Sequence, residues 1–239
     1  MNRRVLVIVG TPLPDTLTHA LAGSYVDAAR AAGAEVRVID LAHDPIPDHP
    51  RSRDQLRAPR ADRPDDLPLD ADVARYLDDV FWADHIAVFH PQWWGTVPAA
   101  LKAFIDRVFL SGATFRYRER SPLSDRLLRG RTARIVMTMD SPRFWNRLVY
   151  RGAAEASLTR ATFGYCGVRT IGITRLTPVR FSDETARRGW IERVAGHGRT
   201  DAASRRRAAS PPHRTASPDD VASPTSMSTR APSEGVKTS

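Results

Sequence analysis

Cysteine is almost absent from the sequence, whose 239 residues include a single one, Cys166. A disulfide within the chain is therefore impossible, and a metal site would need ligands of other residue types. Free cysteine is among the most often buried residues, so we expect an inert thiol in the core. The sequence gives no reason to expect a bound metal ion.

Long apolar runs are absent as well. No stretch approaches the roughly 20 apolar residues of a membrane-spanning helix. The short run in the opening segment, MNRRVLVIVG, is ended by Gly10 and Pro12, and no small-residue cleavage site follows. We therefore expect a cytoplasmic protein without membrane insertion.

Lysine is scarce, since only Lys102 and Lys237 are lysines among the 36 basic residues. The formal net charge of +9 rests on arginines that are scattered among acidic residues. Such a one-sided use of arginine indicates a coding bias rather than a selected basic patch. We expect no specific recognition of nucleic acid.

Aromatic residues are missing after Trp190. Residues 197–239 are rich in Ser, Pro, Thr and Arg, a composition that cannot bury enough apolar surface to order a chain. We predict one domain over residues 1–196 and a disordered tail over residues 197–239.

What the sequence does contain is an alternation of two segment types. Short β-branched runs, typical of buried strands, occupy residues 4–9, 35–40, 85–90, 133–138 and 168–174. Helical patterns lie around residues 17–29, 72–82, 98–109 and 146–165, with a last helix capped by Ser182. Strands that alternate with helices predict an α/β fold with a five-stranded parallel sheet covered on both faces. The segment 43–70 is long enough to be a functional loop.

Ligands of such sheets bind beyond the C-terminal ends of the strands, where three loops are informative. The first, GTPLPDTLT, has neither a Walker ending nor the G-x-G-x-x-G fingerprint. It offers hydroxyl groups from Thr11, Thr16 and Thr18 where the first helix begins. They could help to bind a phosphate group there, or they could merely cap the helix.

The second loop, HPQWWGTVPA, places Trp93 and Trp94 between Pro91 and Gly95. Adjacent residues point in different directions, so core packing explains the pair poorly. An irregular backbone with free amides, beside a tryptophan ring, is suited to a planar heterocycle. The alternative is that both rings cover the edge of the sheet.

The third loop, TMDSPRFWN, contains a polar turn at Asp140, Ser141 and Pro142. Together, a phosphate cradle and two loops that flank a flat ring predict a flavin site. Binding of a nicotinamide nucleotide alone would usually bring the glycine fingerprint, which is missing.

The segment HPQWWGTVPAALKAFIDRVFLSGATFRY resembles the flavodoxin-like NAD(P)H:quinone oxidoreductases, which include the modulator of drug activity B proteins and the ancillary subunits of potassium-efflux systems. The positions that match are Pro91, Trp94, Pro98, Ala99, Leu101, Lys102, Asp106, Arg107, Val108, Phe109 and Tyr117. The resemblance covers roughly residues 5–194 and implies a flavodoxin-like three-layer sandwich.

The resemblance also implies non-covalent FAD or FMN. The residues implied near its phosphate are Thr11, Thr16, Leu17 and Thr18. Those implied along the isoalloxazine ring are Pro91, Gln92, Trp93, Trp94 and Gly95, with Thr138, Met139, Asp140 and Ser141 at its other edge. Relatives often carry a Thr-Thr-Gly-Gly turn in place of TMDSP, so the choice between FAD and FMN stays open.

The activity implied is hydride transfer from NAD(P)H through the flavin to a quinone-like acceptor. In a homodimer, Phe115 and Tyr117 would line the partner's pocket, where Tyr117 could donate a hydrogen bond to the acceptor or merely pack. Arg107 is expected to be a structural helix charge.

The alternative to an oxidoreductase is a flavin-binding regulatory module of a membrane transporter. An electron-carrier flavodoxin fits less well, because such carriers are usually acidic and this chain is basic.

Overall fold

Five parallel strands form the central sheet of the computed structural model, which describes residues 2–60, 62–63 and 65–204. The strands are β1 (Arg4–Val9), β2 (Glu35–Asp40), β3 (His85–Pro91), β6 (Thr132–Thr138) and β7 (Arg169–Leu176). Their order across the sheet is β2-β1-β3-β6-β7, and every neighbouring pair is parallel. All five predicted strands are present, at nearly the predicted bounds.

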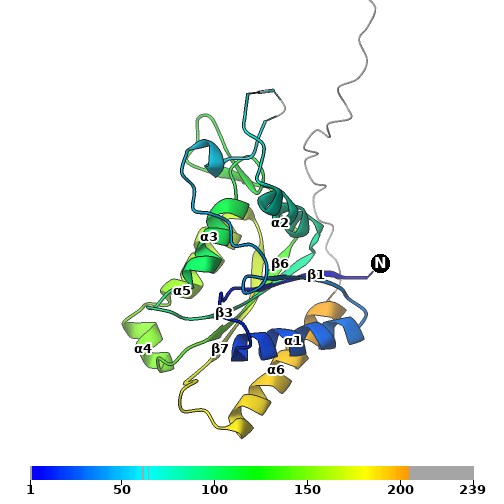
Figure 1. The fold of residues 1–239 in the computed structure, drawn as a ribbon, viewed down its shortest axis with the longest axis vertical. Coiled ribbons are helices and arrows are strands. Elements are labelled where there is room, and N and C mark those ends of the chain that lie inside the picture. Colours follow the sequence, from blue (N-terminus) through cyan, green and yellow to red (C-terminus); the bar gives the residue numbers. More distant parts are fainter. Residues whose placement is uncertain (1, 61, 64, 205–239) are drawn as a thin grey trace, which may run out of the picture.

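Helices cover both faces of the sheet (Figure 1). One face carries α1 (Leu17–Ala31) and α6 (Glu184–Ala203); the other carries α2 (Ala71–Trp82), α3 (Ala99–Val108), α5 (Ala153–Ala156) and the π-helix η2 (Ser157–Gly164). Within the described part of the chain, no helix has the length and apolar character needed to cross a membrane. The predicted flavodoxin-like three-layer sandwich is confirmed.

Strand β1 shows how the sequence builds both layers. Val5, Val7 and Val9 pack with the α1 and α6 side, whereas Leu6 and Ile8 pack with the α2 and α3 side. Successive side chains of a strand point to opposite faces, so a continuous apolar run is what a sheet buried on both faces requires.

The single helix predicted over residues 146–165 is wrong. The chain instead forms α4 (Arg143–Leu148), a break, α5 and η2. Arg151 and Gly152 have φ angles of 52° and 63°. A right-handed helix cannot include this left-handed conformation, so the chain turns there.

The start of the last helix is also corrected. Asp183, not Ser182, is the N-cap, because its carboxylate accepts a hydrogen bond of 2.7 Å from the N–H of Ala186. Ser182 donates its hydroxyl to the carbonyl of Val179 instead.

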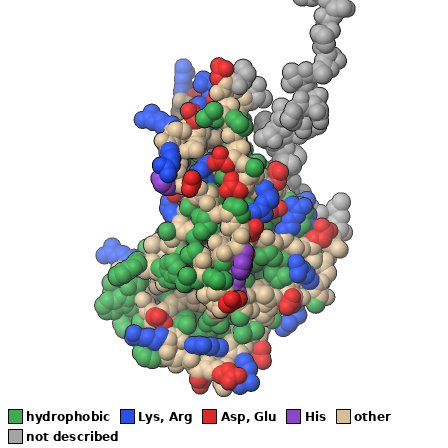
Figure 2. Space-filling view, in the orientation of Figure 1, with side chains coloured by type: hydrophobic (Ala, Val, Ile, Leu, Met, Phe, Trp, Pro, Cys, Tyr) green, Lys and Arg blue, Asp and Glu red, His purple; other side chains and the backbone are tan. Residues whose placement is uncertain are grey.

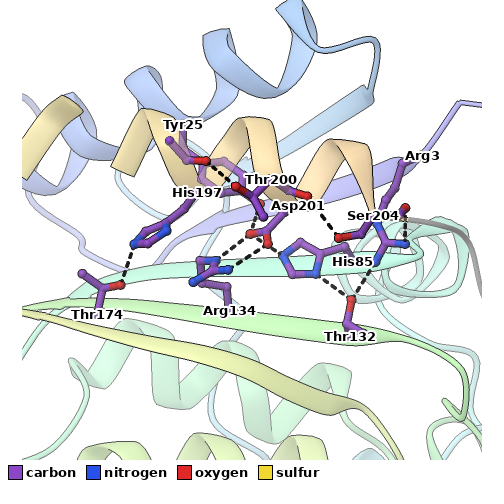
Figure 3. Close-up of polar contacts among 11 residues, drawn as sticks. Arg3, Tyr25, His85, Thr132, Arg134, Thr174, His197, Thr200, Asp201 and Ser204 are labelled. Carbon is purple, nitrogen blue, oxygen red and sulfur yellow. Dashed lines mark hydrogen bonds and ion pairs between the residues drawn. The ribbon is translucent and has the colours of Figure 1, made fainter. Parts of the chain in front are cut away.

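The predicted tail begins too early. Helix α6 continues through Ala203, and the side chain of Asp201 is fully buried in it. Asp201 accepts hydrogen bonds from Arg134 (2.6 and 2.9 Å) and from the hydroxyl of Tyr25 (2.9 Å), as Figure 3 shows. Composition missed this because buried polar contacts of Asp201, rather than large apolar residues, hold the end of the helix. The rest of the predicted tail, residues 205–239, lies outside the described residues.

Three smaller elements complete the fold. The hairpin of β4 (Phe115–Tyr117) and β5 (Ser124–Arg126) was not predicted, nor was the 3-10 turn η1 (Asp54–Leu56) within the segment 43–70. Arg107 anchors that segment, since its buried guanidinium bonds the carbonyl of Asp48 and the carboxylate of Asp70. Arg107 is structural, as expected, but it is a buried anchor for this segment rather than a helix charge.

Cys166 is buried, as expected, with its thiol 3.6 Å from the hydroxyl of Thr114. Burial raises the pKa of the thiol to about 11. The group is therefore protonated at neutral pH and is not a nucleophile.

Candidate functional site

The three predicted loops lie at one edge of the sheet and are tied together by backbone hydrogen bonds. The N–H of Gly10 donates to the carbonyl of Phe89 (2.7 Å), and that of Gln92 donates to the carbonyl of Thr138 (2.7 Å). The N–H of Met139 donates to the carbonyl of Leu176 (3.0 Å). The pairing of the strands thus continues one residue past their ends, which brings the loops to a common level.

In the first loop, Thr16 is the N-cap of α1. Its N–H lies 3.3 Å from Nδ1 of His19, and its hydroxyl lies 2.9 Å from the same atom. Thr11 and Thr18 are buried. The N–H groups of Leu17 and Thr18 donate to no acceptor among the described residues, and the first turn of α1 carries no acidic residue. Capping and anion binding are therefore compatible, because Thr16 caps the helix and free donors remain.

The second loop is a tight turn from Trp93 to Thr96. These two residues exchange backbone hydrogen bonds of 3.0 and 2.9 Å, and the φ angles of Trp94 and Gly95 are 51° and 76°. Positive φ at both central residues defines a type I′ turn. The expectation that the loop's amides are free is right for Trp94 and Gly95, whose N–H groups have no acceptor within the described chain, but wrong for Gln92, Trp93 and Thr96.

The ring of Trp94 is 100% exposed. It does not cover the edge of the sheet, so that alternative is wrong for Trp94. Trp93 is 37% exposed, and the ring of Tyr150 lies against Gly95, where an added Cβ would come within 3.2 Å of it.

The side chain of Gln92 is fixed by a chain of buried polar groups that the sequence did not reveal. Its Nε2 donates to Oδ1 of Asn146 (2.7 Å), and Nδ2 of Asn146 donates to Oε1 of Glu155 (2.9 Å). Arg175 donates to the same oxygen (2.6 Å). Burial alone would raise the pKa of Glu155, but the hydrogen bonds from Arg175 and Asn146 lower it, so the carboxylate is ionised. The one sequence signal is the acidic residue within the apolar run AAEA.

His90 lies at the end of β3 and is fully buried. Its Nδ1 lies 2.9 Å from the carbonyl of Pro91, whereas its Nε2 has no hydrogen-bond partner among the described residues. Burial lowers the pKa of His90 to about 4, so the ring is neutral at physiological pH. The Nε2 atom of His90 is thus a neutral hydrogen-bond acceptor shortly before the turn from Trp93 to Thr96.

The third loop is hydrogen-bonded to the loop that follows β7, which the sequence analysis did not single out. Thr138 and Met139 are buried at the end of β6. The exposed Asp140 accepts a hydrogen bond of 2.7 Å from the N–H of Arg180, and the carbonyl of Ser141 accepts one of 2.6 Å from the hydroxyl of Thr177. Asp140 and Ser141 therefore hold the loop that follows β7.

Phe115 and Tyr117 do not join this site within one chain. Helix α3 begins beside the tryptophan turn and runs back along the sheet, so the hairpin that follows lies at the opposite end of the strands. There Leu128 donates its N–H to the carbonyl of Cys166, just before β7 begins. The ring of Tyr117 is exposed and packs edge-on against Phe115, with 5.3 Å between centroids.

Exposed apolar side chains surround the loops. They are Leu13, Trp93, Trp94, Phe144, Trp145, Leu148 and Phe181. Figure 2 shows a hydrophobic area where Figure 1 places α4. Apolar surface of this kind marks a place where a planar ligand or another protein surface binds.

A cavity of about 300 Å³ lies at the edge strand β7. Its lining residues are Arg143, Ile173, Thr174, Arg175, Arg193 and His197. None of them belongs to the predicted flavin residues, but Arg143 lies in the third loop and Arg175 bonds Glu155, so the cavity adjoins the candidate site.

Comparisons with known proteins agree with this architecture. The family described as the flavodoxin-like fold matches residues 3–189. The FMN-dependent NADH:quinone oxidoreductase of Alcanivorax borkumensis is 30% identical over 175 residues, which cover 70% of this chain and 84% of that protein. The protein of the same name from Azospirillum brasilense is 32% identical over 182 residues, or 72% and 85% of the two chains.

The solved structure of a putative quinone reductase from Klebsiella pneumoniae shares the fold, with a TM-score of 0.68 and 21% identity over 84% of this chain and 86% of that one. The resemblance of the tryptophan segment to the flavodoxin-like quinone oxidoreductases is thereby confirmed at the level of the family. This chain belongs to the flavodoxin-like fold family and is a relative of the FMN-dependent NADH:quinone oxidoreductases.

Proposed function

We propose that this protein is a flavin-dependent NAD(P)H oxidoreductase that reduces a quinone-like acceptor, with FMN as its flavin and NADH as its preferred donor. The observation that carries the proposal is the convergence of three loops, with unpaired N–H donors, at one edge of the sheet. The sequence left FAD and FMN open, and the names of the two relatives support FMN and NADH.

The donor set at this edge fits FMN. The free N–H groups of Leu17 and Thr18 and the hydroxyl of Thr16 would bind the phosphate, where the positive end of the α1 dipole favours an anion. The N–H groups of Trp94 and Gly95 would donate to the polar edge of the ring. FMN, when bound, would supply the redox chemistry by accepting a hydride from NADH and passing it to the quinone.

The remaining residues orient these groups and exclude water. The ionised Glu155 holds Asn146, which in turn directs the amide of Gln92 and leaves its Oε1 free to accept a hydrogen bond. The exposed rings of Trp93 and Trp94 offer apolar area against which flat molecules can stack. Thr138, Met139, Asp140 and Ser141 close the site from the β6 side.

We further propose that the working form is a two-fold homodimer. The hairpin that carries Phe115 and Tyr117 lies at the far end of its own sheet, so these rings can meet a flavin only in a neighbouring copy. In that arrangement Tyr117 would contact the acceptor bound above the partner's flavin.

The test is to titrate purified protein with FMN and with FAD by flavin fluorescence, and then to follow NADH and NADPH oxidation with a simple benzoquinone. We expect one FMN per chain, tighter binding of FMN than of FAD, and steady NADH oxidation that requires both FMN and quinone. A folded protein that binds neither flavin would contradict the proposal. Tight flavin binding without turnover would favour the regulatory module instead.

A further inference from the structure

Three side chains with metal-binding atoms converge beside the first loop. His19 lies in the first turn of α1, Asp40 ends β2, and His43 lies in the turn that follows. Nε2 of His19 is 3.2 Å from Oδ1 of Asp40, and Nδ1 of His43 is 3.0 Å from Oδ2 of the same carboxylate. One ligand atom from each residue lies within 4.8 Å of the others.

These separations are near those between the ligands of a tetrahedral zinc ion. With Zn–N and Zn–O bonds of about 2.0–2.2 Å, neighbouring ligand atoms are about 3.3–3.5 Å apart. The two distances to Asp40 are slightly shorter and end on different carboxylate oxygens, so small side-chain shifts would bring one oxygen and both nitrogens around one ion. His43 has the most exposed side chain of the three, at 64%, so its ring is free to complete the geometry by a small rotation.

Backbone hydrogen bonds fix the turn that carries Asp40 and His43. The N–H groups of His43 and Asp44 donate to the carbonyl of Asp40 at 2.9 and 2.7 Å, and the carboxylate of Asp44 accepts the N–H of Asp40 at 2.8 Å. The turn therefore holds Asp40 and His43 in fixed relative positions. Such preorganisation reduces the entropy that a ligand must otherwise remove on binding.

Hydrogen bonds also orient the side chains of the cluster. Oδ1 of Asp40 accepts the N–H of Ala42 at 3.0 Å, and Nδ1 of His43 lies 3.0 Å from Oδ2. Nδ1 of His19 lies 2.9 Å from the hydroxyl of Thr16. Nδ1 also accepts the N–H of Thr16 at 3.3 Å, and these contacts hold the ring with its Nε2 3.2 Å from Oδ1 of Asp40.

We propose that His19, Asp40 and His43 bind one divalent cation of the Zn²⁺ class, with a fourth position left for water or an exogenous ligand. Two imidazoles and one carboxylate form a ligand set that zinc accepts readily. The ion would tie the beginning of the segment 43–70 to the N-terminal turn of α1. It would thereby stabilise the turn that carries Thr16 and Thr18, whether or not that turn binds FMN.

The sequence did not suggest this site, and we expected no metal ion. His19 and Asp40 are 21 residues apart and belong to different elements. Only the parallel pairing of β1 with β2 brings the end of β2 beside the start of α1.

The experiment uses untagged full-length protein as purified, treated with a chelator and titrated with Zn²⁺ in competition with a chromophoric chelator. We expect one tightly bound Zn²⁺ per chain. His43→Ala should weaken binding at least tenfold. His49→Ala is the matched control, because His49 is also an exposed histidine of the same segment but lies outside the cluster.

Co²⁺ provides an independent readout of geometry. We expect intense visible absorption, typical of tetrahedral Co²⁺, in the wild type and in His49→Ala, and its loss in His43→Ala and Asp40→Asn. Far-UV circular dichroism checks that each variant is folded, and the exposed position of His43 makes His43→Ala the safer variant. Absence of specific Zn²⁺ binding in the wild type, or equal binding by His43→Ala and His49→Ala, would overturn the proposal.

Discussion

At position 94 a tryptophan has a backbone conformation that suits glycine. Its φ angle is 51° and its ring is fully exposed, so neither local geometry nor core packing explains the residue. Left-handed backbone costs a residue with a Cβ about 1–2 kcal/mol. Local strain of this kind is typical of functional sites, which agrees with a role for the ring in ligand binding.

Trp94→Gly should therefore separate stability from binding. The variant relieves the strain, so its free energy of unfolding should equal or exceed that of the wild type. Loss of stacking, which contributes about 0.5–1.5 kcal/mol beyond buried area, should raise the Kd for FMN roughly tenfold. Fluorescence titration measures the Kd, and Leu67→Ala, which removes an exposed apolar side chain outside the three loops, is the control. An unchanged Kd in Trp94→Gly would show that the ring does not contact the flavin.

The buried, neutral ring of His90 predicts that the protein loses stability in acid. Its folded-state pKa, about 4, lies below the ordinary 6.5, so the unfolded chain takes up a proton at a pH where the folded chain does not. The stability that depends on a neutral His90 is therefore fully present above pH 6.5 and is lost as the pH falls toward 4. Between pH 7 and pH 5 this one group should remove about 2 kcal/mol.

Urea unfolding of His90→Gln at those two pH values tests the prediction. The variant should lose less stability on acidification than the wild type, whatever its stability at pH 7. His49→Gln, which alters an exposed histidine, should keep the wild-type dependence. If all three proteins lose the same free energy of unfolding between pH 7 and pH 5, His90 is not buried as a neutral ring.

At the scale of elements, a buried ion pair anchors the C-terminal end of α6. Asp201 bonds Arg134 in β6 and Tyr25 in α1, and its Oδ2 is 3.2 Å from Nε2 of His85 (Figure 3). Burial would raise the pKa of Asp201, but the hydrogen bonds from Arg134 and His85 hold it well below its usual range. The carboxylate therefore joins the two strands β3 and β6 and the two helices α1 and α6.

Asp201→Asn should destabilise the protein by about 3–5 kcal/mol, because it leaves the charge of Arg134 buried without its partner. The depressed pKa of Asp201 means that its contribution is present above about pH 4 and disappears as the pH falls further, so the deficit should shrink in acid. Chemical denaturation measures both effects.

The control is Glu192→Gln, because Glu192 is an exposed acid on the same helix. This variant should change the free energy of unfolding by no more than about 0.5 kcal/mol. A similarly small effect of Asp201→Asn would contradict this account.

At the scale of the whole molecule, one chain leaves its proposed site incomplete. The apolar side chains of Phe144, Trp145 and Leu148 stay exposed around the loops, and Tyr117 is exposed at the other end of the sheet. A two-fold dimer would cover both surfaces with the same contact.

Complementation tests the dimer. Thr16→Arg should abolish FMN binding, because it places a bulky side chain at the phosphate cradle, and Tyr117→Ala should lower turnover with FMN still bound. Co-refolding the two variants creates mixed dimers in which one site has an intact first loop and an intact tyrosine. NADH oxidation should therefore recover to about a quarter or less of wild-type activity, since only one site in each mixed dimer is complete. Each variant refolded with itself is the control, and mixed dimers that form, as a mass tag shows, but stay inactive would contradict the arrangement.

The sequence by itself determined the five strands of the sheet, the helices α1, α2 and α3, the presence of the last helix, and the three loops. The runs RVLVIV and HIAVFH are apolar on both faces, and the helical periods between them are local patterns. The pair Trp93 and Trp94 was conspicuous because local packing could not explain it. Such features are visible in sequence because they depend on neighbours along the chain.

Only the tertiary structure decided which distant polar groups meet. Arg134 interrupts an apolar strand without indicating that Asp201 is its partner, and Gln92 gives no sign of Asn146 and Glu155. The cluster of His19, Asp40 and His43 is equally hidden. These contacts join residues of different elements, and their geometry is set by how helices pack on the sheet. A buried hydrogen bond requires both partners within about 3 Å, a condition that no pattern along the chain encodes.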